Sequence, residues 1–343
     1  MTIPPASPMT LDKVGTRPKI AVIVTGGTLT ALANDPFEIC DYGQAGSLDG
    51  QALVSRCEGL AGHYDFIFPS FVARPSFDMA APECLELCRL CQRTLNDHPD
   101  LVGFVLTHGT GTLEETAFFL SRVWDFPVPV VLTGAQRPAS ALSSDGYMNF
   151  YQSVMLAASS YACNNRVLVV MNGDIHAPDD VTKRSNFDLD TFISPNFGPL
   201  ARIIGKNVIM RNGGFAGQSK PTISWRELGN LPRVDILYCH AGGDTCAIEA
   251  FVAAGARGIV VAGFPPGYAT SRQAARLTRW ITEAGGTVIM ASRGTGPVVN
   301  NTRNNGHQFI PGGRYLPVKA RILLQLALAE GKNFNQIAQL FTE

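Results

Sequence analysis

The sequence predicts an α/β protein of two domains, with a larger amino-terminal domain built on a parallel sheet and a smaller carboxy-terminal α/β domain. Short apolar, β-branched runs alternate with segments of helical spacing along most of the chain. The 343 residues are enough for one large or two ordinary domains. A composition of 45% hydrophobic and 16% charged residues can bury a full core.

The clearest strand, turn and helix lie at residues 101–120. An apolar run ends at Leu106, the glycine turn THGTGT follows at 107–112, and helical spacing begins at Leu113. In open α/β sheets, ligands bind at the carboxyl ends of strands, where the next helix presents free N–H groups. This turn therefore places the hydroxyls of Thr110 and Thr112 at a candidate site.

A similar turn follows the first expected strand, Lys19 to Val24. It reads Thr25-Gly26-Gly27-Thr28 and lacks the Gly-Lys-Ser/Thr ending of a phosphate loop. The aperiodic segment from about Ala31 to Asp49 is expected to be a long loop, and loops of this length often act as lids. Further elements of the first domain are expected as strands at 64–68, 128–132 and 166–171, with helices after Pro82 and from about Tyr147.

The domain boundaries follow from where this alternation weakens. We expect a flexible lead over 1–18, the amino-terminal domain over 19–205, a linker over 206–227 and the carboxy-terminal domain over 228–343. The linker region contains a short strand and a Gly-Gly break. The second domain is expected to have strands at 234–238, 258–261 and 287–290, with helices at 245–254, 271–284 and 317–329.

Charge and apolar patterning limit the partners. The 28 basic and 28 acidic residues balance, so no net field draws the protein to nucleic acid or a membrane. The first residues hold no signal-peptide core, and no run of about 18 uncharged apolar residues occurs. We therefore expect a cytoplasmic protein that acts on a small neutral or zwitterionic molecule.

Three cysteines, Cys84, Cys88 and Cys91, have the spacing of one helix face. A metal or cluster site would need a fourth ligand and usually a loop spacing such as C-x-x-C. We expect these cysteines to be buried and inert.

Seven segments, each occurring once, follow one another over nearly the whole chain. They are TGGTL at 25–29, SFDM at 76–79, THGTGTLEETAFF at 107–119, LTGAQRPASALSSDGYMN at 132–149, VMNGDI at 170–175, DVTKRSNFDLDTFISPNFGPL at 180–200 and KARILLQLAL at 319–328. Together they resemble the bacterial L-asparaginase/glutaminase family, and two of them are near copies of family signatures.

The resemblance implies a threonine amidohydrolase without a metal or organic cofactor. It assigns the nucleophile to Thr28, a second threonine to Thr110, the lysine of D-V-T-K to Lys183 and the flexible-loop tyrosine to Tyr42. It also implies a homodimer or homotetramer in which a neighbouring carboxy-terminal domain closes each site. Substrate contacts are expected at Ser76, Phe77, Gly111, Gly27 and Ala135.

The chemistry is consistent without the family name. A carboxamide is a poor electrophile and a threonine hydroxyl a poor nucleophile, so the reaction needs a base and donors for the developing oxyanion. Lys183 beside Thr110 would serve as base or proton relay when neutral, and burial lowers the pKa of a lysine towards that condition. Backbone N–H groups around Thr28 and Thr110 are the expected oxyanion donors.

The chain departs from the family pattern where the substrate's head group would bind. Gly111 replaces the aspartate of His-Gly-Thr-Asp-Thr, and Phe77 replaces a glutamine. An acid lent by a neighbouring subunit has no counterpart among Asn300, Asn301, Asn304 and Asn305. Charge-assisted hydrogen bonds contribute roughly 1.5–3 kcal/mol each, so losing two weakens asparagine binding about a hundredfold or more. We expect an amidase of shifted specificity, for amides that lack the α-amino group or carry a larger apolar body.

Two other functions stay open. One is a true asparaginase or glutaminase in which Asp41 or Asp244 replaces the missing acid. The other is a non-catalytic small-molecule binder on the same fold, although a binder needs neither nucleophile nor lysine. Ammonia release would exclude the binder.

Several residues also have purely structural interpretations. Thr28, Thr110 and Ser76 are hydroxyl residues of the kind that cap helices. Tyr42 would then anchor a lid, and Gly111 would satisfy a positive φ. We expect His108 to be a hydrogen-bonded structural histidine, and Glu114 and Asp145 to tie turns to helix starts.

Overall fold

The computed structural model describes residues 17–211 and 223–342. The chain divides into two compact units between Thr222 and Ile223. The flexible lead expected over 1–18 falls outside the described residues as far as residue 16.

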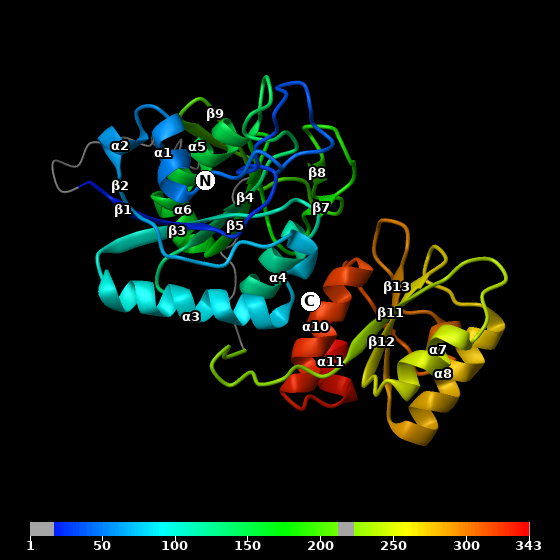
Figure 1. The fold of residues 1–343 in the computed structure, drawn as a ribbon. Coiled ribbons are helices and arrows are strands. Elements are labelled where there is room, and N and C mark those ends of the chain that lie inside the picture. The colour runs from blue at the N-terminus through cyan, green and yellow to red at the C-terminus, as the bar shows by residue number, and fades with distance from the viewer. Residues whose placement is uncertain (1–16, 212–222, 343) are drawn as a thin grey trace, which may run out of the picture. The chain divides into compact units, whose positions relative to one another are not determined.

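The larger unit is built on an eight-stranded sheet with the order β10-β9-β6-β5-β4-β3-β1-β2 (Figure 1). The strands from β2 to β5 in this order run parallel, as expected. Their central members, β3, β4 and β5, are dominated by apolar residues and almost wholly buried, because helices cover both faces. The parallel strands are β1 (Lys19–Val24), β2 (Asp65–Ile67), β3 (Leu101–Thr107), β4 (Val130–Thr133) and β5 (Val167–Met171).

The expectation of an all-parallel sheet is wrong at one end. The strands β6 (Asp174–His176), β9 (Ala201–Ile204) and β10 (Asn207–Met210) pair antiparallel to their neighbours. The reversal occurs at Asn172 and Gly173, which have φ of 50° and 78° and form the Asn-Gly turn typical of a two-residue hairpin. The strand β10 lies within the expected linker, 206–227, yet pairs in the sheet, and residues 212–222 lie outside the described residues.

Helices lie on both faces of this sheet (Figure 1). On one face, α1, α2, α5 and α6 share a continuous apolar core with β1, β3, β4 and β5. On the other lie α3 and α4. The bounds are α1 (Gly50–Arg56), α2 (Leu60–His63), α3 (Ala81–Asp97), α4 (Leu113–Val123), α5 (Gly146–Ala157) and α6 (Ser160–Asn165), with a short 3-10 helix η1 (Ser76–Asp78).

The helix α3 confirms the prediction for the three cysteines. Cys84, Cys88 and Cys91 are buried and unpaired, because they form the apolar face of this amphipathic helix. Burial raises the pKa of Cys84 to about 12 and that of Cys88 well above its ordinary value. Across the described residues, no three His, Cys, Asp or Glu side chains gather as metal ligands.

The smaller unit has a parallel sheet of order β11-β12-β13-β14. Helix α10 packs against its strands on one side, and α7 and α8 complete an apolar core on the other (Figure 1). The strands are β11 (Val234–Tyr238), β12 (Gly258–Gly263), β13 (Thr287–Ser292) and β14 (Ile310–Pro311). The helices are α7 (Cys246–Ala253), α8 (Ser271–Ala284), α9 (Thr302–Gly306), α10 (Pro317–Ala329) and α11 (Phe334–Leu340).

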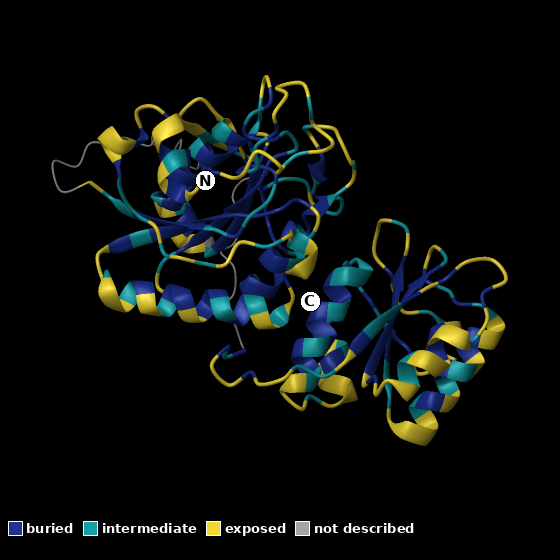
Figure 2. Ribbon diagram, in the orientation of Figure 1, coloured by how far each residue is buried: buried dark blue, intermediate teal, exposed yellow. Residues whose placement is uncertain are grey.

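The two-domain α/β class, with the larger sheet first, is therefore confirmed. Figure 2 shows the central strands of both units as buried and the outer helix faces as exposed. Among the described helices, none combines the length and apolar character needed to span a bilayer.

Candidate active site

Three turns meet at one edge of the larger sheet because the strands before them are parallel neighbours. Val24 at the end of β1 is in register with Thr107 at the end of β3, and Thr107 is in register with Thr133 at the end of β4. The segments carrying Thr28, Thr110 and the loop after β4 therefore leave the sheet side by side. This is the edge at which open α/β sheets bind ligands.

The first two turns touch through glycine. Gly27 has a φ of 94°, and a Cβ atom built on it would lie 2.5 Å from the backbone N of Gly109. No side chain fits between these backbones, and the left-handed φ also favours glycine. Gly27 is therefore fixed by geometry at the place where the two threonine turns meet.

Thr28 forms a hydrogen bond with the tyrosine of the long loop. Its Oγ1 atom lies 2.8 Å from Oη of Tyr42, and its side chain is buried. The loop is held by its stem, because Gly43 N donates to Leu32 O and Leu48 N donates to Thr30 O. The helix-cap interpretation of Thr28 is wrong, since no helix begins after this turn.

Thr110 forms the second polar pair. Lys183 Nζ donates to Thr110 Oγ1 over 2.7 Å, and Thr110 Oγ1 donates to Oε1 of Gln136 over 3.2 Å. Thr110 is buried and does not cap α4, whose N-cap residue is Thr112. The structure thus brings the predicted threonine and lysine together.

Lys183 reaches Thr110 from a small hairpin formed by β7 (Thr182–Lys183) and β8 (Phe192–Ile193). Glu114, in the first turn of α4, holds the base of this hairpin. Its Oε1 atom accepts from Thr182 Oγ1 at 3.1 Å and from Lys183 N at 3.4 Å. Glu114 thus ties a helix start to a neighbouring segment, as expected.

Asp145 plays the corresponding part in the loop after β4. Its carboxylate accepts from the backbone N of Gln136 and of Arg137. This anchor fixes the backbone from which the Gln136 side chain reaches Thr110.

Burial changes two pKa values in this region. It lowers the pKa of Lys183 below that of an ordinary lysine, because water no longer stabilises the ammonium form. It lowers the pKa of His108 to about 4. The ring nitrogens of His108 bond with Gly109 O and Thr116 Oγ1, so the prediction of a structural histidine is confirmed.

The expected substrate-binding residues are brought together only in part. Ser76 lies against Gly109 and Gly111, the two glycines of the turn that carries Thr110. A Cβ atom built on Gly109 would lie 2.9 Å from Ser76 Oγ, and one built on Gly111 would lie 3.1 Å from it. Phe77, beside it in η1, is 78% exposed. Ala135 is fully buried in the apolar core, so a substrate contact there would come from its backbone.

Two structural interpretations are corrected. Ser76 does not cap the helix after it, because α3 begins at Ala81 with Ala80 as its N-cap. Gly111 is not required by a positive φ, because its backbone lies outside the left-handed region. Nothing in the backbone therefore prevents an aspartate at position 111.

Gln136 is a site residue that we did not predict. It lies in the segment LTGAQRP, which indicated a turn at the correct sheet edge. Its importance comes from contacts with Thr110 and with Asn186 O, which are 26 and 50 residues away in the chain. Such long-range contacts leave no local pattern in a sequence.

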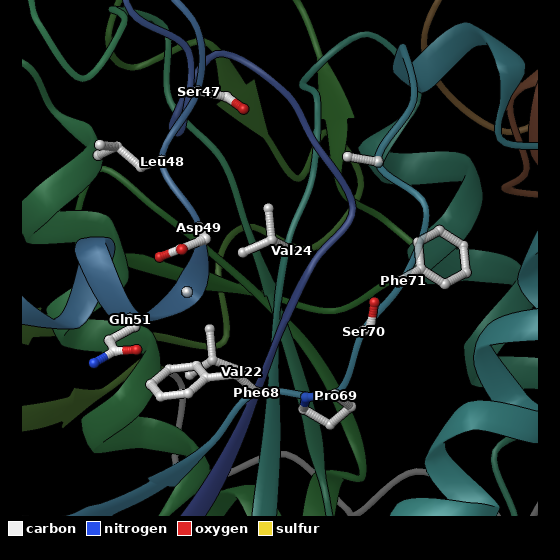
Figure 3. Close-up of a pocket in the computed structure, with 12 residues that line it drawn as sticks. Val22, Val24, Ser47, Leu48, Asp49, Gln51, Phe68, Pro69, Ser70 and Phe71 are labelled. Atoms are coloured by element: carbon white, nitrogen blue, oxygen red, sulfur yellow. The ribbon is translucent and has the colours of Figure 1, made fainter.

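A pocket of about 410 Å³ lies beside β1 (Figure 3). It exists because β2 pairs with β1 only as far as Ala21, while β1 continues to Val24. Side chains of Val22, Val24 and Phe68 line it, together with residues 47–51. The predicted catalytic residues are not among its lining, so we do not assign the substrate to it.

Comparison with known proteins places this chain in a family. The family model described as asparaginase, N-terminal, matches residues 19–213, and the model described as glutaminase/asparaginase C-terminal domain matches residues 233–341. The chain belongs to the asparaginase family.

Individual relatives agree with this assignment. The asparaginase-family chain is 33% identical over 335 residues to the probable periplasmic L-asparaginase of Haemophilus influenzae, with 95% of this chain and 93% of the relative covered. It is 34% identical to L-asparaginase 2 of Escherichia coli, with the same coverage of 95% and 93%. The crystal structure of a probable cytoplasmic L-asparaginase from Campylobacter jejuni superposes with a TM-score of 0.88 at 31% identity, covering 95% of this chain and 100% of that one.

Within this asparaginase-family chain, two of the four asparagines between residues 300 and 305 have structural contacts. Asn301 caps α9, and the buried Asn304 donates to Gly267 O. Two acids were considered as replacements for the aspartate missing at position 111. Asp244 accepts a hydrogen bond from Cys246 N, whereas Asp41 is the chain neighbour of Tyr42 and accepts from Gln44 Nε2.

Proposed function

We propose that this protein hydrolyses a small carboxamide to a carboxylate and ammonia through an acyl-enzyme on Thr28, with a specificity shifted away from asparagine. Membership of the asparaginase family makes the chain a hydrolase of amide C–N bonds. One observation supports the threonine mechanism most directly. Two buried threonine hydroxyls lie at one sheet edge, one bonded to Tyr42 and the other to Lys183.

The proposed reaction has two halves. In the first, Thr28 Oγ1 bonds to the amide carbon as its proton passes to Tyr42 or through the Thr110–Lys183 pair. The C–N bond then breaks, and the nitrogen takes a proton and leaves as ammonia. In the second, water attacks the threonine ester and releases the carboxylate. Backbone N–H groups of the two turns would stabilise the oxyanion in both halves.

Lys183 suits the role of proton relay. A lysine accepts a proton only when neutral, and burial lowers its pKa towards that form. Its contact with Thr110 supports an exchange between those two groups. A binder without catalytic activity would need neither this pair nor the bond between Thr28 and Tyr42.

The shifted specificity rests on positions 77 and 111. Gly111 has no carboxylate to pair with an α-amino group, although its backbone would accommodate an aspartate. Phe77 adds an exposed aromatic ring next to Ser76. A less polar pocket favours an amide without an α-amino group, or one with an apolar body.

A genuine L-asparaginase or glutaminase is the second candidate. The names of the relatives favour it, and Asp41 lies next to Tyr42 in the loop that reaches Thr28. In that case Asp41 would take the part of the acid absent at position 111.

Ammonia release tests both candidates. The substrates are asparagine, glutamine, succinamic acid, and aryl and alkyl carboxamides, with Thr28→Ala as the inactive control. We expect higher kcat/KM on amides that lack the α-amino group and about a thousandfold loss or more in Thr28→Ala. Preference for asparagine would refute the shifted specificity. Wild-type rates in Thr28→Ala would remove Thr28 as nucleophile, and no ammonia from any amide would favour the binder.

We also propose a cytoplasmic homodimer or homotetramer with its sites near the subunit interface. The cytoplasmic part is supported by the name of the Campylobacter jejuni structure and by the cysteines, all of which are free among the described residues. Light scattering of the purified protein measures the assembly size, and fractionation of the source cells measures the compartment.

A further inference from the structure

Gln136 lies between Thr110 and the hairpin that carries Lys183. Its Oε1 atom accepts from Thr110 Oγ1 at 3.2 Å, and its Nε2 atom donates to Asn186 O at 3.0 Å. Asn186 is in the connection between β7 and β8. The oxygen of the glutamine amide therefore bonds to the turn after β3, and its nitrogen bonds to the connection between β7 and β8.

These two bonds fix the direction of the amide. A backbone carbonyl only accepts, so the group facing Asn186 O must be the NH₂ of Gln136, and the group facing Thr110 must be the oxygen. A reversed amide would face the Asn186 carbonyl with its own oxygen and lose that bond.

The amide direction in turn fixes the proton of Thr110. A hydroxyl has one proton and two lone pairs. Because the Gln136 oxygen can only accept, the Thr110 proton points to Gln136, and Thr110 presents a lone pair to Lys183 Nζ. In the resting site Lys183 is the donor and Thr110 the acceptor.

We propose that Gln136 is a positioning residue that directs the Thr110 proton away from Lys183 and so favours the protonated lysine in the resting enzyme. This inference rests on the proposed threonine mechanism, in which Thr110 and Lys183 exchange a proton. Gln136 also holds the far end of the hairpin, while Glu114 holds its base.

Other charged groups around the lysine are few. Glu114 contacts the backbone of Lys183 from α4, and Arg184 pairs with Asp190 within the hairpin. A neutral replacement at Gln136 adds no charge to these surroundings, and it removes the bond to Asn186 O together with the bond to Thr110.

The test compares Gln136→Met, which has similar length but no hydrogen bonds, with Gln136→Glu, which keeps an acceptor next to Thr110. Without the glutamine oxygen, Thr110 turns its proton to neutral Lys183 and stabilises it, so the acidic limb of the kcat/KM–pH profile moves down by about half a pH unit or more. Gln136→Glu moves it up. We expect a lower plateau kcat in Gln136→Met, with KM within about twofold of wild type.

A matched control is Ser144→Ala, which removes a hydroxyl bond to Arg137 O in the same loop. It should leave the acidic limb unchanged. The proposal is overturned if the acidic limb of the kcat/KM–pH profile in Gln136→Met stays in place or moves to higher pH. A glutamine with a merely structural role would change the activity without changing the pKa of Lys183. If Gln136→Met does not fold, Gln136→Leu, which is equally neutral and has no hydrogen-bonding group, is judged by the same criterion.

A second measurement separates this proposal from the proposed function. NMR titration of the Lys183 side chain, assigned with Lys183→Arg, reports its pKa without any turnover. A lower pKa in Gln136→Met supports the positioning role even if Thr28→Ala shows that the nucleophile was misassigned. An unchanged pKa refutes the positioning role even in an active enzyme.

Discussion

The hydroxyl of Tyr42 lies 2.8 Å from that of Thr28, although the two residues belong to a long loop and to a strand-end turn. The loop is held at its stem by backbone bonds between its two arms, so the phenol is carried on a supported segment. A phenol in this position can pass a proton to or from the threonine as the C–O bond forms.

Tyr42→Phe should therefore lower kcat about a hundredfold or more while changing KM little, because the ring stays and the proton carrier is lost. The matched control is Tyr147→Phe, which removes a phenol hydroxyl bonded to Ala139 O and Arg56 in the same unit. Equal losses in both variants would show that the effect is structural.

The activity should rise with pH as Lys183 loses its proton, and this limb should lie below the pKa of an ordinary lysine. Burial lowers the pKa of Lys183, and only the neutral amine accepts a proton. We expect Lys183→Met to lose about a hundredfold or more in kcat. The measurement is kcat/KM against pH. A wild-type profile in which kcat/KM does not rise with pH contradicts the role of Lys183 as base.

Much of this site could be predicted from local sequence. The threonine turns follow runs such as KIAVIV, whose period and composition identify a buried strand, and parallel neighbours bring such turns to one edge. The antiparallel end was not predicted, although Asn172-Gly173 is the Asn-Gly pair that signals a hairpin. Gln136 was missed because its partners are set by the tertiary fold.

Short elements were also missed. The helices α1 and α2 have seven and four residues, too few for an apolar period to appear. The two-residue strand β7 carries Lys183 and pairs with the two-residue strand β8, and a pair this short leaves no pattern in the sequence. The lysine itself could be found only by resemblance.

Gly27→Ala should damage both folding and activity. The new Cβ would lie 2.5 Å from Gly109 N and force the two threonine turns apart. Gly46→Ala is a matched control, because Gly46 has the same φ of 94° and nothing within 4 Å of its Cβ position. A left-handed alanine costs roughly 1–2 kcal/mol, so both variants lose this much. We expect Gly27→Ala alone to lose stability beyond this shared cost, and its kcat to fall about a hundredfold. Equal melting temperatures and equal rates in the two variants would contradict the contact.

His108 should make the larger unit less stable in mild acid. Its pKa in the folded protein is lowered to about 4 by burial, below the ordinary value of about 6.5 in the unfolded chain. The unfolded chain therefore binds the extra proton between about pH 6.5 and 4, and the free energy of unfolding falls by up to about 3 kcal/mol across that window. Above pH 6.5 this contribution is constant. Urea unfolding between pH 7 and 5 should show a smaller fall for His108→Gln, and parallel curves would contradict the buried neutral ring.

Gly111→Asp should convert the enzyme towards asparagine. The backbone at 111 accepts a side chain. Among the described residues, chain neighbours aside, the one atom within 4 Å of a Cβ built there is Ser76 Oγ at 3.1 Å, a side-chain atom that can rotate. A carboxylate there would pair with the α-amino group of asparagine and lower its KM by about ten- to a hundredfold. The KM for an amide without an α-amino group should change little. Gly111→Asn is the matched control, because it has nearly the same size and no charge. If Asn and Asp lower the asparagine KM equally, charge pairing is not the cause, and the argument for a shifted specificity fails at this position.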